Sequence, residues 1–114
     1  MGRVLTNQDE KIKELEVTIP NEYTLIKDIP LNLRIRVEQK LSPLKLYFNY
    51  PIKSLNVFLS FDCKEPSENE YKLKYFNPSR VIIEANDKKV FTQEWLYITL
   101  ESYNDTPIIV NPKF

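Results

Sequence analysis

The densest group of side chains that could do chemistry lies between residues 62 and 70. Its carboxylates come from Asp62, Glu65, Glu68 and Glu70. Hard oxygen ligands of this kind bind Ca²⁺. However, the spacing is not that of an EF-hand, Lys64 lies among the acids, and no glycine allows a sharp ligand turn. We therefore interpret the segment as a solvated acidic loop and keep these acids as candidate calcium ligands.

Nucleophilic and acid–base catalysis have few residues to draw on. Cys63 is the one cysteine, the chain contains no histidine, and its one glycine is Gly2. A cysteine nucleophile is normally activated by a nearby base, and histidine is the commonest general acid–base group. This composition excludes His-based catalysis, Cys/His zinc centres, glycine-rich phosphate loops and internal disulfides. We expect no enzymatic activity and no cofactor, with a small histidine-free enzyme as an alternative.

Aromatic side chains offer a different kind of site. Four of them alternate with the aliphatic residues of their own strands, so they belong to the other strand face: Tyr47, Phe58, Trp95 and Tyr97. If the aliphatic residues face the core, these aromatics point outward. They would then form a patch suited to a protein partner, a sugar ring or a second subunit. The alternative is that an arm, a loop or a second layer covers them.

The elements that must position these residues are β-strands. Apolar side chains alternate with polar ones at residues 15–19, 31–37, 44–50, 55–61, 71–75 and 96–100, and short apolar runs lie at 81–83, 90–91 and 108–110. A period of two describes strands with one buried face. The sequence predicts an all-β fold: an antiparallel two-sheet β-sandwich of jelly-roll or Greek-key type, with seven to nine short strands.

Prolines and asparagines punctuate this pattern. Eight prolines interrupt the apolar runs at short intervals, and we expect them at breaks or strand entrances. Without glycine, turns that need a positive φ must use Asn or Asp, and Asn86-Asp87 and Asn104-Asp105 are the candidates. Residues 1–13 are expected to form a flexible arm or a helical stub, because Thr6 to Asp9 has capping-box spacing. Residues 14–114 are expected to form one sandwich domain.

Composition constrains the partners and the compartment. The chain has 114 residues, 16 basic and 16 acidic, so its formal net charge is zero. Nucleic acids and anionic membranes reward a basic surplus, so we expect neither as a partner. The start carries no apolar run typical of a signal peptide, and a lone cysteine demands no oxidising compartment. We expect a cytoplasmic protein, and the richness in Lys, Asn, Ile and Tyr suggests a eukaryotic, AT-rich genome.

The last 60 residues or so resemble the bacterial pre-peptidase C-terminal domain, and related C2-like sandwiches. The resemblance lies in a central strand, Leu55 to Phe61, then a polar loop, then a strand beginning at Trp95, then a closing strand at Ile108 to Val110. The chain departs from the family at Gln93-Glu94, where a glycine usually precedes the tryptophan, and no aspartate precedes Leu55. The resemblance implies a non-catalytic accessory or interaction domain.

These observations lead to one principal hypothesis about function. We expect a non-catalytic protein–protein interaction or structural module of a larger assembly, with a protein partner or a second copy of the chain bound at the aromatic patch. The alternative is a carbohydrate- or calcium-dependent ligand-binding sandwich that uses the aromatic face or the acidic loop.

Overall fold

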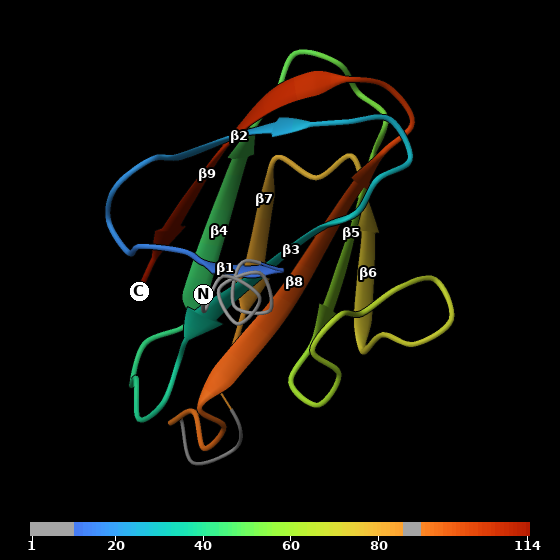
Figure 1. Cartoon of the computed structure of the whole chain (residues 1–114). Helices are drawn as coiled ribbons and strands as arrows, with labels where there is room; N and C mark the ends of the chain where they lie inside the picture. The colour runs from blue at the N-terminus through green and yellow to red at the C-terminus, as the bar shows by residue number, and fades with distance from the viewer. Residues whose placement is uncertain (1–10, 86–89) are drawn as a thin grey trace, which may run out of the picture.

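The chain folds into two layered β-sheets, as the computed structural model shows (Figure 1). The structure describes residues 11–85 and 90–114. In chain order the strands are β1 (Ile12–Glu14), β2 (Asn21–Leu25), β3 (Leu31–Arg36), β4 (Leu44–Asn49), β5 (Leu55–Ser60), β6 (Leu73–Phe76), β7 (Arg80–Ile83), β8 (Trp95–Ser102) and β9 (Thr106–Lys113). Among the described residues no helix is long and apolar enough to cross a membrane. The prediction of an all-β sandwich is confirmed.

Strands that are distant in the sequence form most of the pairs. The five-stranded sheet has the order β1-β3-β8-β5-β6, and the four-stranded sheet has the order β2-β9-β4-β7. Figure 1 shows β8 running between β3 and β5 in the five-stranded sheet. All pairs are antiparallel except β1 with β3, which is parallel. Within the described residues, β5 and β6 are the only consecutive strands that pair, so the chain repeatedly crosses between the sheets.

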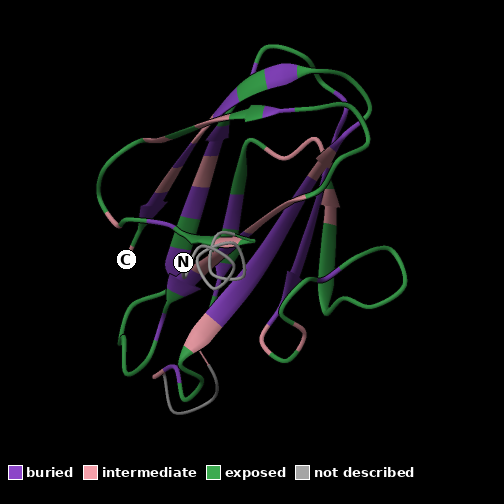
Figure 2. Cartoon of the chain, in the orientation of Figure 1, coloured by how far each residue is buried: buried purple, intermediate pink, exposed green. Residues whose placement is uncertain are grey.

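The hydrophobic core lies between the two sheets. It takes the alternating aliphatic side chains of both inner faces, among them Leu33, Ile35, Leu46, Val57, Leu59, Ile98 and Val110. Leu33, Val57 and Ile98 are 0% exposed. Figure 2 shows buried residues concentrated along the long strands, while the connecting loops are mostly exposed. The two-residue period marks the buried face of the long strands, which present alternate side chains to the core. It does not do so at residues 71–75, where Tyr71 and Leu73 are exposed and Tyr75 is half-buried.

The segment from Leu15 to Ile19 is not the strand that its alternation predicts. β1 ends at Glu14, and the chain turns through Thr18, whose φ is 69°, before β2 begins at Asn21. The Asn21 side chain holds this turn, because its Oδ1 accepts from the Glu16 N–H (3.0 Å) and its Nδ2 donates to the Glu16 carbonyl (2.9 Å). The turn carries the chain from one sheet to the other, which an alternating pattern does not reveal.

Further local predictions differ from the structure. The run Val90-Phe91 is not a strand in the structure: Phe91 is buried in the core, and its backbone bonds Gln39 and Lys40. Among the described non-glycine residues, positive φ angles belong to Thr18, Asp28, Gln39 and Asn77, and not to Asn104 or Asp105. Asn86-Asp87 lies outside the described residues. Of the expected arm, Ile12 and Lys13 form β1 rather than a helical stub, and residues 1–10 lie outside the described part.

Two prolines lie inside a strand, against the prediction that prolines mark its breaks. Pro107 and Pro112 both belong to β9, between β2 and β4. β2 pairs with residues 106–110 and β4 with residues 109–113, so each proline has a paired strand on one side only. A missing N–H is tolerated where a strand lacks a neighbour. The offset between β2 and β4 therefore accommodates both rings.

Candidate interaction surfaces

Three of the four predicted aromatics share the outer face of the five-stranded sheet. Phe58 on β5 and Trp95 and Tyr97 on β8 alternate with core residues, and none of the three belongs to the core cluster. Tyr47 lies on β4, in the other sheet, and so cannot join them. The strand faces were therefore predicted correctly, but the four residues do not form one patch.

Phe58 is not exposed, contrary to the expected patch. Its exposed fraction is 1%, because the connection between β5 and β6 folds back over the sheet. The Tyr71 ring centre lies 5.8 Å from that of Phe58, and the Lys74 Nζ lies 5.7 Å from it. Pro66 in the same connection is also buried. A loop therefore covers Phe58, as in the alternative outlined from the sequence.

Tyr97 is also buried, at 8% exposure, whereas Trp95 is half-buried. In the sheet Tyr97 lies opposite Arg34 on β3 and Ser60 on β5. The Arg34 guanidinium carbon stands 4.0 Å from the Trp95 ring centre, and that of Arg36 stands 5.4 Å from it. Long arginine side chains cover aromatic faces in this way while their charged ends stay near water.

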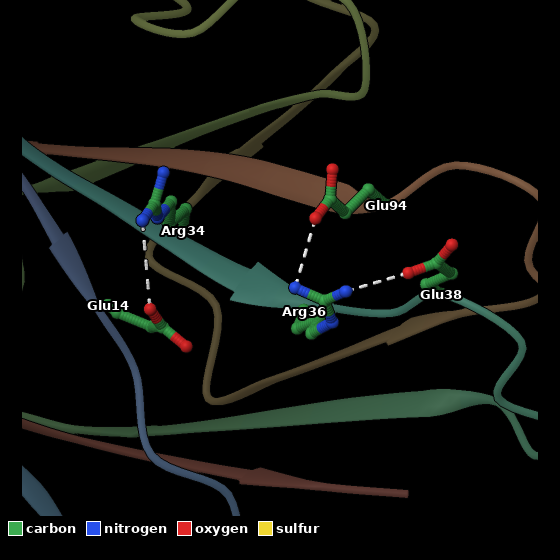
Figure 3. Close-up of polar contacts among 5 residues, drawn as sticks. All are labelled: Glu14, Arg34, Arg36, Glu38 and Glu94. Carbon is green, nitrogen blue, oxygen red and sulfur yellow. Dashed lines mark hydrogen bonds and ion pairs between the residues drawn. The ribbon is translucent and has the colours of Figure 1, made fainter.

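Three glutamates surround these two arginines, as Figure 3 shows. Arg36 Nη2 donates to Glu38 Oε1 at 2.8 Å, and Arg36 Nη1 lies 3.0 Å from Glu94 Oε2. Arg34 Nη2 lies 3.7 Å from Glu14 Oε1, which is an ion pair but too long for a hydrogen bond. The Arg34 Nε is buried and has no hydrogen-bond acceptor among the described residues. Exposed ion pairs add little to stability, so this cluster mainly fixes the side chains that stack on Trp95.

Other aromatics are exposed on the same side of the molecule. We name the group of Tyr71, Phe76 and Tyr103 the aromatic edge. Their exposed fractions are 44%, 61% and 53%. Phe76 on β6 is the direct neighbour of Asn56 on β5, and Asn56 Nδ2 donates to the Tyr103 hydroxyl at 2.9 Å. Asn56 therefore links Phe76 to Tyr103.

Lys74 joins the remaining member of the aromatic edge to this pair. Its Nζ donates to Glu68 Oε1 at 2.6 Å, and this hydrogen bond raises the pKa of Lys74 above its ordinary value, against the lowering effect of burial. Tyr71 and Lys74 both lie beside the Phe58 ring, and Phe58 and Asn56 are successive outward residues of β5. The aromatic edge therefore lies around these two residues of β5.

The sequence contained a signal for part of this surface. Trp95, Tyr97, Thr99 and Glu101 point outward on β8, and Tyr103 continues the same alternation just beyond the end of the strand. Phe76 likewise follows Lys74 on the outward side of β6. Extending the two-residue period by one step identifies both. Nothing local distinguishes them from Phe58 and Tyr97, because the loop that covers Phe58 is a tertiary feature.

The candidate calcium ligands are spread along the acidic loop. Glu68 binds Lys74, and Glu65 Oε2 lies 3.7 Å from the Lys11 Nζ. The loop is closed by backbone hydrogen bonds between Ser67 and Glu70, and the Asp62 N–H donates to the Ser60 hydroxyl. In residues 11–85 and 90–114, no three His, Cys, Asp or Glu side chains are grouped so that they could hold a metal ion.

Cys63, in the same loop, is half-buried with a free thiol.

A small pocket lies between this loop and the sheet. It has a volume of about 160 Å³, and its lining includes Asn32, Phe58, Glu65, Thr99 and Glu101. The Thr99 hydroxyl donates to Asn32 Oδ1 at 2.8 Å across β3 and β8. Phe58 forms an aromatic wall of the pocket, and Thr99 and Asn32 are polar lining residues. Because Thr99 and Asn32 already hydrogen-bond each other, this pair does not require a ligand.

Comparison with solved structures identifies a domain with the same fold. The pre-peptidase C-terminal domain of collagenase from Bacillus anthracis superimposes with a TM-score of 0.62, at 10% sequence identity, over 90% of this chain and 94% of that domain. The chain has the fold of a pre-peptidase C-terminal domain. The resemblance first noted over the last 60 residues therefore extends, as a fold, to nearly the whole chain. No protein-family model matches the sequence, and no curated protein matches it.

Proposed function

We propose that the chain is a non-catalytic interaction module that binds a protein partner through the aromatic edge. The observation that carries the proposal is the exposure of Tyr71, Phe76 and Tyr103 around the outward residues Phe58 and Asn56 of β5. The solved structure of the same fold is one domain of a collagenase, which agrees with a role within a larger assembly. The proposal keeps the predicted class of function and moves its site to these neighbouring aromatics.

The composition of the aromatic edge supports this role. Aromatic side chains supply much contact area with few rotatable bonds, and they dominate binding energy when a partner buries them centrally. Lys74 and Asn56 lie between the rings, and Glu101 on β8 lies opposite Asn56, so polar groups accompany the rings. Protein interfaces combine apolar anchors with polar groups.

The energetic weight should fall on Phe76. It is the most exposed of the three rings, at 61%, and its side chain is purely apolar. If a partner buried this ring, the apolar surface removed from water would contribute about 25 cal/mol of binding free energy per Å². Replacing such an anchor costs more than about 1 kcal/mol of binding free energy. The same replacement should cost little folding stability, because the ring does not pack in the core.

The test is affinity capture with matched surface variants. Wild type, Phe76→Ser, Phe76→Tyr and the control Leu41→Ser are immobilised; Leu41 is 76% exposed in the connection between β3 and β4. A partner retained by wild type is identified by mass spectrometry, purified and titrated by calorimetry. We expect Phe76→Ser to weaken binding about tenfold or more, which is about 1.4 kcal/mol, while Phe76→Tyr and Leu41→Ser bind like wild type.

Two results would count against the proposal. One is a purified partner that binds Phe76→Ser as tightly as wild type. The other is a glycan array on which wild type binds a sugar and Phe76→Ser does not, which would assign the aromatic edge to carbohydrate. Thermal unfolding of each variant shows that lost binding is not lost folding.

A further inference from the structure

The outer face of the four-stranded sheet carries a group of cations around Tyr47. We name Lys45, Arg80 and Lys113 the basic face. In the sheet Lys45 lies directly opposite Lys113 on β9 and Ile82 on β7. One step along, Tyr47 lies directly opposite Asn111 and Arg80. These two rows of side chains point away from the core, since Leu44, Leu46 and Phe48 on β4 point into it.

The pairing of Lys45 with Lys113 is unfavourable for the isolated chain. Like charges directly opposite on neighbouring strands repel. No ion pair involves Lys45, Arg80 or Lys113 within residues 11–85 and 90–114. By contrast, Arg34 and Arg36 on the other sheet are surrounded by glutamates. Places where a sequence breaks a local rule without compensation in the fold are expected at functional sites.

Apolar groups lie between these cations. Tyr47 is half-buried, and the Lys113 Nζ lies 5.6 Å from its ring centre. Ile82 is 42% exposed beside Lys45. The acids nearest in the sheet lie at its margins: Glu22 is opposite Ile109 on β9, and Glu84 follows the last residue of β7. The face therefore offers the apolar groups of Tyr47 and Ile82 with three cations beside them.

We propose that the basic face binds a short, extended acidic segment of a partner protein. An apolar side chain of the segment contacts Tyr47 and Ile82, and flanking carboxylates pair with Lys45, Lys113 and Arg80. Binding relieves the repulsion between the two lysines. The inference rests on the proposed role as an interaction module but uses a different sheet. Nucleic acid is less suited, because its binding is dominated by contacts between cations and phosphates, and this face holds three cations.

The direct test is a titration of ¹⁵N-labelled protein. The probe is a synthetic peptide of Glu and Asp around one central phenylalanine, and its control replaces the acids with Gln and Asn. We expect amide shifts at Lys45, Tyr47, Arg80, Asn111 and Lys113 with the acidic peptide only. The affinity should fall as salt is raised, because exposed charges are screened.

The sharpest variant is Lys45→Glu, which puts a carboxylate opposite Lys113. We expect peptide affinity to fall at least tenfold while the melting temperature rises, since repulsion becomes attraction. Lys72→Glu, an exposed lysine just before β6 in the other sheet, makes the same charge change and should leave peptide binding intact. A variant that gains stability as it loses the ligand separates a binding role from a structural one.

Several outcomes would overturn the inference. They are shifts that avoid the basic face, equal binding of the Gln/Asn peptide, or Lys45→Glu that binds like wild type. Tighter Lys45-dependent binding of a DNA duplex or of phosphatidylserine vesicles would reassign the face. So would Lys45-dependent self-association in sedimentation. Phe76→Ser should bind the peptide normally, so a failure here is distinguishable from a failure at the aromatic edge.

Discussion

The guanidinium carbon of Arg34 lies 4.0 Å from the centre of the Trp95 ring. The two residues are not direct neighbours in the sheet: Arg34 lies opposite Tyr97, and Trp95 lies opposite Arg36. Arg34 therefore reaches diagonally along β8 to cover the tryptophan. A cation over an indole face is attracted by the negative face of the ring, with tryptophan the strongest partner.

This contact predicts a measurable loss in Arg34 variants. Arg34→Met keeps most of the side-chain length and removes the charge, so it should lower the free energy of unfolding by about 0.5–1 kcal/mol. Arg34→Ala should lose more, because packing of the aliphatic stem is lost as well. Urea unfolding followed by the fluorescence of Trp95, the single tryptophan, measures both. Unfolding of Arg34→Met at the wild-type midpoint would show that the charge contributes nothing.

The inner faces of the sheets predict a larger effect. Leu33 is 0% exposed in the core, so Leu33→Ala should cost about 2–4 kcal/mol, as should truncation of Val57, Leu59 or Ile98. Leu41 is 76% exposed, so Leu41→Ala should cost less than about 0.5 kcal/mol. Chemical denaturation of this matched pair gives the comparison. Equal losses from Leu33→Ala and Leu41→Ala would mean that the buried faces are assigned wrongly.

The core was predictable because burial on one face of a strand forces a period of two. Residues 31–37 and 96–100 show that period, and the structure places Leu33 and Ile98 in the same core. β2 was not assigned from the sequence, because its alternation is short: only Tyr23 and Leu25 face the core, and Tyr23 is half-buried. Pairing between distant strands, such as β2 with β9, leaves no local trace in the sequence.

The candidate site was predictable only in part. Alternation correctly assigned Phe58 and Tyr97 to an outer face, but exposure depends on what folds over that face. Tyr71 covers Phe58, although thirteen positions separate them in the sequence, and this contact follows from the path of a loop. A period of two indicates which face of the sheet a side chain points to, but not whether another segment of the chain covers that face. The exposed Phe76 and Tyr103 therefore replace the predicted pair.

The turn after β1 predicts a stabilising substitution. Thr18 has a φ of 69°, in the left-handed region that costs a β-branched residue about 1–2 kcal/mol. Thr18→Gly removes that strain but adds flexibility to the unfolded chain, at about 0.4–1 kcal/mol. We expect a net gain of up to about 1 kcal/mol. Thr18→Ala keeps a Cβ and serves as the control. A lower melting temperature for Thr18→Gly than for Thr18→Ala would contradict the argument.

Two tyrosines predict how stability depends on alkaline pH. Burial raises the pKa of Tyr23 and of Tyr50 above the ordinary value of 10.0, and the charge of Glu16 adds to the effect at Tyr23. Above a pH of about 10 the unfolded chain loses these protons first, so the free energy of unfolding falls as pH rises. Tyr23→Phe removes one ionisable group and should lessen that fall, whereas stability at neutral pH should change little because no described hydrogen bond involves the Tyr23 hydroxyl. Urea midpoints measured at neutral pH and at a pH of about 11 check this. The same alkaline loss in wild type and in Tyr23→Phe would show that another group is responsible.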